Sequence, residues 1–155
     1  MFRIEKETTN DADKINLIGS INEDVDFKTV FGPLSKNLEI NCRQVTRLNS
    51  MGIKGWCLFF QGLRDSGAKI SFYECVPALV EQCNFLSNLM LTPEVVSICL
   101  RYICPSCDSE HTEIAKVVDL KMNNITVPTV NCQSCKTEME FDEIPSQYFS
   151  FLRRK

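Results

Sequence analysis

Apolar residues in the first two thirds of this 155-residue chain recur at two spacings. Alternation with polar residues predicts strands over residues 2–5, 15–18, 38–45 and 69–73. Spacing of three and four residues predicts helices over residues 27–34 and 52–66 and from Pro77 onward. Strands that alternate with helices in this order predict an α/β fold, in which a mixed sheet has helices packed on it.

The pattern changes after residue 91. Residues 95–102, 112–120 and 125–130 are rich in apolar and β-branched side chains and predict strands, with Asn123–Asn124 at a hairpin turn. These strands predict a small antiparallel sheet with little core of its own. We therefore expect two units, residues 1–92 and residues 93–155, without a flexible linker between them.

Four of the nine cysteines form two Cys-x-x-Cys pairs, and 24 residues separate the pairs. The four residues are Cys104, Cys107, Cys132 and Cys135. One such turn delivers two thiolates to the same ion, so two turns predict a tetrahedral zinc site within a zinc ribbon. Four thiolates leave no open coordination position, so the expected Zn²⁺ is structural. Redox dithiols and unrelated free thiols are the alternative interpretations.

The remaining cysteines lie scattered among apolar residues, where a free thiol packs as a small hydrophobic side chain. An odd number of cysteines without a secretory signal disfavours a disulfide framework. The N-terminal residues lack the apolar core of such a signal, and no apolar run is long enough to span a bilayer. We expect a cytoplasmic protein.

The charge balance argues against a nucleic-acid partner. The formal net charge is −3. Residues 1–103 carry 11 basic and 12 acidic side chains, and residues 104–155 carry 6 and 8. Binding to a phosphate backbone usually requires a basic face, and neither part has a basic excess. A zinc-ribbon adaptor for nucleic acid therefore stays an alternative hypothesis only.

The chemistry of an enzyme is also missing. His111 is the only histidine, so a Ser-His-Asp or Cys-His arrangement has no second anchored partner, and four cysteines already complete a metal shell without it. The acidic residues between 138 and 143 fit a solvated edge better than a paired-carboxylate site. Two aromatic segments have no role in this chemistry. In the first, Trp56 or Phe59 could take part in a subunit or domain contact. The second, the tail 148–155, could dock on an acidic partner or a membrane surface, but we favour packing back over the ribbon.

The segments 15–23, 48–53 and 67–70 together resemble the STAS family, which is named for sulfate transporters and antagonists of anti-sigma factors. The resemblance covers about residues 1–90. Its most specific part is a loop directly before a predicted helix, formed by Asn49, Ser50, Met51 and Gly52. In the bacterial anti-sigma-factor antagonists the matching loop often reads Asp-Ser-Ser-Gly-Leu, and its first serine is phosphorylated by a kinase that is itself the anti-sigma factor.

This resemblance implies that Ser50 is a phosphoacceptor in a partner-binding loop. A phosphate there would meet the free amides of a helix N-terminus. Asn49 replaces the usual aspartate and Met51 the second serine, and either Asn49 or Ser50 could simply cap the helix. The resulting hypothesis is a non-catalytic bacterial signalling protein whose partner is an anti-sigma factor or a kinase. The protein could also form a homodimer. A thiol redox sensor is an alternative function.

Overall fold

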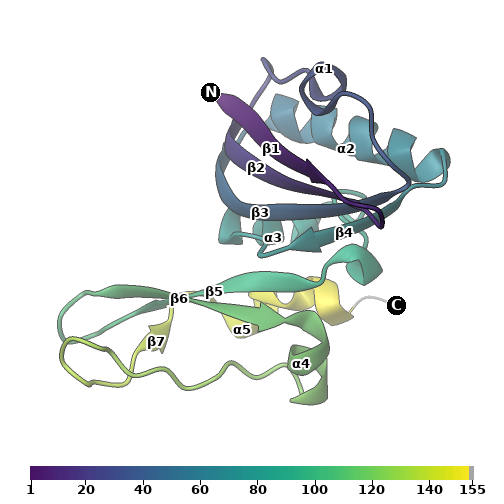
Figure 1. Cartoon of the computed structure of the whole chain (residues 1–155). Helices are drawn as coiled ribbons and strands as arrows, with labels where there is room; N and C mark the ends of the chain where they lie inside the picture. The colour runs from purple at the N-terminus through teal and green to yellow at the C-terminus, as the bar shows by residue number, and fades with distance from the viewer. Residues whose placement is uncertain (154–155) are drawn as a thin grey trace.

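A computed structural model describes residues 1–153 of the chain (Figure 1). Its first sheet contains β1 (Phe2–Thr8), β2 (Asp13–Ile21), β3 (Asn37–Leu48) and β4 (Lys69–Tyr73), in that order. β1 and β2 pair antiparallel, whereas β2 with β3 and β3 with β4 pair parallel. Parallel neighbours need crossovers, which α1 (Phe27–Phe31) and α2 (Ser50–Asp65) provide. The predicted α/β class, with helices on a mixed sheet, is confirmed.

Helix α1 is shorter than the predicted span of 27–34. Asp26 caps it, because its side chain accepts a hydrogen bond from the amide of Thr29. Gly32 ends it with a φ of 63°, a left-handed conformation that glycine adopts without steric cost, and Pro33 follows.

The second sheet is antiparallel, in the order β6-β5-β7, and consists of β5 (Ser97–Ile103), β6 (Glu110–Lys116) and β7 (Glu140–Phe141). The remaining helical elements are α3 (Pro77–Phe85), the 3-10 helix η1 (Thr92–Glu94), α4 (Val117–Met122), α5 (Pro145–Tyr148) and the 3-10 helix η2 (Ser150–Arg153). The predicted division of the chain at residues 92 and 93 falls inside η1.

One predicted strand of the second sheet is correct only in its first half, and another does not form. The strand expected over 112–120 ends at Lys116, and Val117–Met122 forms α4 instead. Val117 and Leu120, three residues apart, are its buried residues, so the helical spacing prevails over the β-branched composition. The turn after α4 has positive φ at Asn124 and Ile125 and leads into an irregular segment over residues 126–130, which replaces the expected hairpin and second strand.

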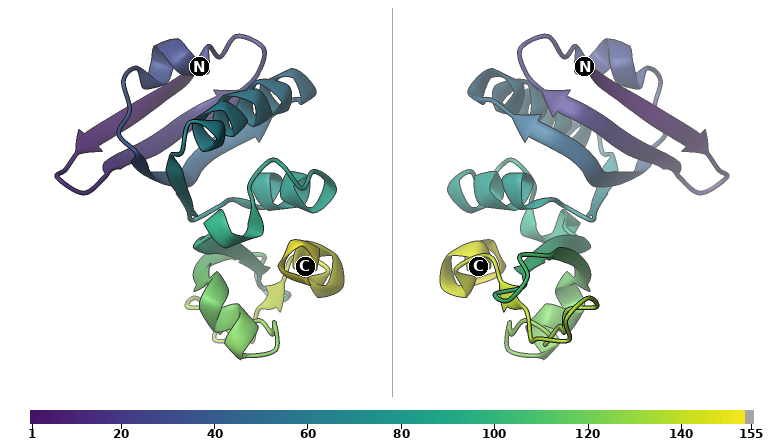
Figure 2. Two further views of the ribbon diagram at one scale, coloured as in Figure 1. Left: turned by 90° about the vertical axis from the view of Figure 1, so that its right-hand side faces the viewer. Right: turned by 90° about the vertical axis from the view of Figure 1, so that its left-hand side faces the viewer.

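The two sheets are joined side by side at β4 and β5. The amide of Val96 donates to the carbonyl of Phe72, and Cys75 and Cys99 continue the ladder with bonds of 3.1 and 2.9 Å. Both bridges, at Phe72–Val95 and Cys75–Ile98, are parallel. α3 packs against β3 of the first sheet, against β5 of the second sheet and against the C-terminal elements α5 and η2. It therefore fills the angle between the two sheets (Figure 2).

The core is aromatic beneath α2. Trp56 and Phe60 are fully buried, with ring centroids 4.7 Å apart, and Phe72 of β4 stacks on Trp56 at 5.6 Å. The indole N–H of Trp56 donates to the carbonyl of Leu89 at 2.8 Å. Because Trp56 is 0% exposed, it is not available for the subunit contact suggested by the sequence, whereas Phe59 is half-buried at the edge of this cluster.

The C-terminal aromatic residues are packed against the body of the protein. Tyr148, Phe149 and Phe151 are all buried. The Tyr148 hydroxyl donates to the carbonyl of Cys99 at 2.6 Å, and the Asn84 side chain of α3 bonds both the Tyr148 carbonyl and the Phe151 amide. The cations at positions 154 and 155 lie outside the described residues.

Candidate metal centre and candidate partner-binding loop

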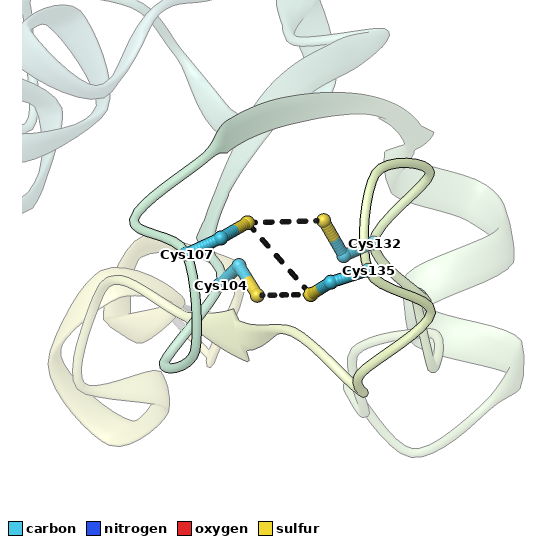
Figure 3. A group of neighbouring side chains, drawn as sticks. All are labelled: Cys104, Cys107, Cys132 and Cys135. Atoms are coloured by element: carbon cyan, nitrogen blue, oxygen red, sulfur yellow. Dashed lines mark hydrogen bonds between the residues drawn. The ribbon is translucent and has the colours of Figure 1, made fainter.

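Two loops at one end of the second sheet carry the four cysteines. The loop that follows β5 holds Cys104 and Cys107, and the loop before β7 holds Cys132 and Cys135. Figure 3 shows the two loops facing each other, with all four sulfur atoms turned into the space between them. Cys104 and Cys132, the first residue of each pair, are buried, and the second residue of each pair is exposed.

The closest sulfur contacts join one loop to the other. The Sγ atoms of Cys104 and Cys135 lie 3.4 Å apart, those of Cys107 and Cys132 lie 3.6 Å apart, and those of Cys107 and Cys135 lie 3.7 Å apart. A disulfide requires about 2.05 Å, and all four residues are free thiols. The four sulfurs therefore form one group and not two bonded pairs.

These distances fit a tetrahedral metal ion. Zinc–thiolate bonds of about 2.3 Å place the sulfurs at the corners of a tetrahedron with edges of about 3.8 Å. All ligand atoms of the group lie within 4.8 Å of one another, and the three closest contacts are 3.4–3.7 Å. The four cysteines that the sequence singled out thus come close enough to hold a metal ion.

Both loops have the same backbone geometry. The amide of Cys104 donates to the carbonyl of Ser109 at 2.9 Å, and that of Cys132 donates to the carbonyl of Thr137 at 2.8 Å. The residue after the second cysteine of each loop, Asp108 or Lys136, has positive φ (62° and 66°) and donates its amide back to the first cysteine. The two loops thus adopt the same turn, and each turn directs its two sulfur atoms to the same side.

A hydroxyl group accompanies the exposed sulfur of each loop. The Oγ of Ser109 lies 3.1 Å from the Sγ of Cys107, and the Oγ1 of Thr137 lies 3.4 Å from the Sγ of Cys135. Neither hydroxyl residue was predicted from the sequence. The signal was present, because Cys-Pro-Ser-Cys-Asp-Ser and Cys-Gln-Ser-Cys-Lys-Thr form a short internal repeat with a hydroxyl two residues after the second cysteine.

The second loop favours thiolates. The backbone amide of Cys135 lowers the pKa of the Cys132 thiol to about 6, and the hydroxyl of Thr137 lowers the pKa of the Cys135 thiol. Burial instead raises the pKa of the Cys104 thiol to about 11. A bound cation would deprotonate Cys104 as well, because a coordinating thiol loses its proton outright.

His111 lies outside this group. It is in β6, opposite Tyr102 of β5, and its Nε2 is 2.6 Å from a carboxylate oxygen of Glu113. Glu138, Glu140 and Asp142 on the neighbouring segment are exposed. Neither His111 nor these carboxylates are among the metal-binding groups found in the described residues, where the four cysteines form the one such group.

The predicted loop Asn49–Gly52 joins β3 to α2, but only Asn49 lies between the two elements, because Ser50, Met51 and Gly52 already form the first turn of α2. Asn49 is the N-cap residue, because its Oδ1 accepts a hydrogen bond from the Gly52 amide at 2.8 Å, while its Nδ2 donates to Glu23 at 2.6 Å. That bond lowers the pKa of the Glu23 carboxyl. Of the two residues that the sequence offered as caps, Asn49 serves, and Ser50 begins the helix with an exposed side chain.

Gly52 fixes this loop against the sheet. A Cβ atom at this position would lie 2.2 Å from the carbonyl oxygen of Ile21 and 2.7 Å from the amide nitrogen of Asn22. Only glycine allows α2 to approach the end of β2 so closely. The exposed residues Ser50 and Met51 (58% exposed) therefore project from a base that has no room to shift.

Comparisons of the chain with protein-family models, with curated proteins and with solved structures give no match. Among the residues that the structure describes, no helix combines the length and the apolar character needed to cross a membrane.

Proposed function

We propose that this protein is a non-catalytic cytoplasmic signalling protein of bacteria, and that it binds a regulatory protein partner through the loop Asn49–Gly52. The observation that carries the proposal is the construction of this loop, in which Ser50 and Met51 are exposed while Asn49 and Gly52 hold them in place. A rigid base with an exposed tip suits recognition, because little conformational entropy is lost when a partner binds.

The resemblance to the STAS family names the partner class and the switch. Ser50 occupies the position of the serine that is phosphorylated in the anti-sigma-factor antagonists, and it lies in the first turn of the 16-residue helix α2. The unpaired amides of that turn and the helix dipole stabilise an added phosphate. The same charge would repel a partner surface adapted to a neutral hydroxyl. The partner proposed is an anti-sigma factor with serine kinase activity.

The four cysteines are proposed to hold a structural Zn²⁺. Four thiolates complete a tetrahedral shell, so the ion would close the two loops on each other and would offer no position for substrate or water. Tetrahedral sulfur sites also accept iron, so elemental analysis of the purified protein is the direct test of the metal. One zinc per chain supports the assignment, and stoichiometric iron or a metal-free protein contradicts it.

The switch is tested by substitution of Ser50. Titration calorimetry with a kinase-type anti-sigma factor from the same genome should give a Kd about tenfold or more higher for Ser50→Asp than for Ser50→Ala, because a carboxylate imitates the phosphate charge. Ser146→Asp is the matched control, since Ser146 is an exposed serine on α5, which packs on α3 and η2. Equal affinities for the two Ser50 variants would contradict the proposed switch.

A thiol redox sensor is the second candidate. Cys107 and Cys135 are exposed, and their sulfurs are 3.7 Å apart across the two loops. Mild peroxide would then join these two thiols in a disulfide and release the metal, with peroxide reduced to water. Metal release that is reversed by a dithiol reductant supports the sensor, and retention of the metal under peroxide rejects it.

A further inference from the structure

The outer face of α2 is uncovered along most of its length. Figure 2 shows α2 lying across one face of the first sheet, with its outer side clear of the other described elements. A groove of about 900 Å³ runs between this face and the segment of α1, and Leu58, Phe59 and Gly62 of α2 line it. Leu58 is 68% exposed, which is unusual for a leucine in the middle of a helix whose opposite face forms the core.

Leu58 and Gly62 form a projection and a notch on the same helix. They are four residues apart, so they lie on one side, and a Cβ atom added at Gly62 would meet nothing within 4 Å. Gly55, one turn before Leu58, is different, because a Cβ there would lie 3.3 Å from the ring of Phe27. The open space at Gly62 is therefore not used by the packing within one chain.

We propose that α2 pairs antiparallel with α2 of a second copy of this chain, with Leu58 of each copy in the Gly62 notch of the other. A two-fold axis makes such a contact self-complementary, since the same patch supplies both projection and notch. The occupant of the groove is thus the leucine of the partner copy. This pairing of two copies requires neither a bound metal nor phosphorylation of Ser50.

The charges on α2 support this register. If Leu58 lies opposite Gly62 of the second copy, residue 54 lies opposite residue 66. Lys54 is then displaced by only one residue, about 1.5 Å along the helix axis, from the partner's Asp65. At about 100° per residue, Lys54 and Asp65 also lie on the same side of α2, about 20° apart. Both side chains are exposed, and the two-fold axis makes the pair twice.

Sedimentation velocity of the full chain, in the presence of a reductant that prevents intermolecular disulfides, tests the pairing. We expect a concentration-dependent shift to twice the monomer mass. Leu58→Glu and Gly62→Leu should each abolish it, whereas Met122→Glu, which charges an equally exposed methionine on α4, should not. At a concentration at which the unsubstituted protein is also monomeric, Gly62→Leu should not lower the melting temperature, because its side chain enters open space, so loss of the dimer would not reflect misfolding.

A charge exchange fixes the register. Lys54→Glu should weaken dimerisation about tenfold by facing Asp65 of the partner, and the double variant Lys54→Glu, Asp65→Lys should restore it. A protein that stays monomeric up to the solubility limit overturns the inference. A dimer that is unaffected by Leu58→Glu also overturns it. If Leu58→Glu abolishes the dimer but Asp65→Lys does not restore the affinity lost in Lys54→Glu, the antiparallel register is overturned.

Discussion

The region around α2 and the region around the four cysteines are stabilised by different interactions. Aromatic rings from α1, α2 and β4 pack in one buried cluster, with Phe31 and Phe59 4.8 Å apart and Trp56 against Phe60. In the cysteine loops, by contrast, Cys104 is the one buried residue of 104–110, and Cys132 is the one buried residue of 131–138. Apolar burial is extensive in the first region and almost absent in the second, so we expect the order of the second region to depend on the metal proposed to bind its sulfurs.

Removal of the metal should give the largest effect. Zinc binding contributes about 10–16 kcal/mol to the folding of isolated zinc-finger peptides. We expect Cys104→Ser, or a strong chelator, to release the ion and to raise amide exchange over residues 104–109 and 132–137, while α2 stays protected. Hydrogen-exchange mass spectrometry measures both regions at once.

The control for this substitution is Cys57→Ser, because Cys57 is a half-buried free thiol on α2. It should keep the full metal content. Loss of protection in α2 after metal removal would contradict the division into an apolar and a metal-dependent region.

Truncation of the core should show the opposite pattern. Trp56→Ala removes a fully buried side chain and its hydrogen bond to Leu89, which should lower the free energy of unfolding by about 3–5 kcal/mol. The metal content should stay unchanged, because Trp56 packs against rings of α1, α2 and β4. Urea unfolding and elemental analysis of the same preparation test the two statements, and a matched loss of metal would refute their independence.

A pair of glycine substitutions tests how closely α2 approaches the sheet. Gly52→Ala forces a Cβ against backbone atoms of Ile21 and Asn22 and should cost about 1–3 kcal/mol. In a sample dilute enough to be monomeric, Gly62→Ala places the same atom in open space within the same helix and should stabilise the protein by up to about 1 kcal/mol. Thermal unfolding of both variants gives the comparison, and stabilisation by both substitutions would show that helix propensity, and not the close approach, decides the outcome.

The smallest expected effect concerns the connection between the two regions. Asn84→Ala removes both hydrogen bonds from α3 to the C-terminal segment and should cost about 1–2 kcal/mol. Exchange should increase in residues 148–153 before it increases elsewhere. Asn88→Ala, an exposed asparagine in the turn after α3, is the control, and equal changes in the two variants would argue against a specific clamp at Asn84.

Local sequence patterns predicted correctly those elements whose signals come from residues close together in the chain. The helix over 52–66 has apolar residues at helical spacing and a capping asparagine before it, and the structure forms it as α2. The grouping of the four cysteines was predictable because two Cys-x-x-Cys pairs at this spacing are typical of ligands that share one ion. The STAS resemblance and the partner stay predictions.

Elements that depend on distant contacts were not predictable. The segment 126–130 looks like a strand, but its position is fixed by the hydroxyl of Tyr102, which donates to the carbonyl of Pro128. The ion pair of Arg64 with Glu94, 2.7 Å long and largely buried, joins α2 to η1 over 30 residues of sequence. Neither contact leaves a periodic signal, so only the folded chain reveals them.

The position of the cysteines along the chain has a mechanical consequence. A metal bound to the four cysteines would close residues 104–135 into a ring, and the described residues beyond Cys135 include β7, α5 and η2 in that order. An unfolding machine that pulled from the side of Arg153 would peel these elements away one by one. It would then pull directly on a thiolate–metal bond, and the ring would resist until that bond broke. The metal would thus decide how far such a machine could travel into the protein.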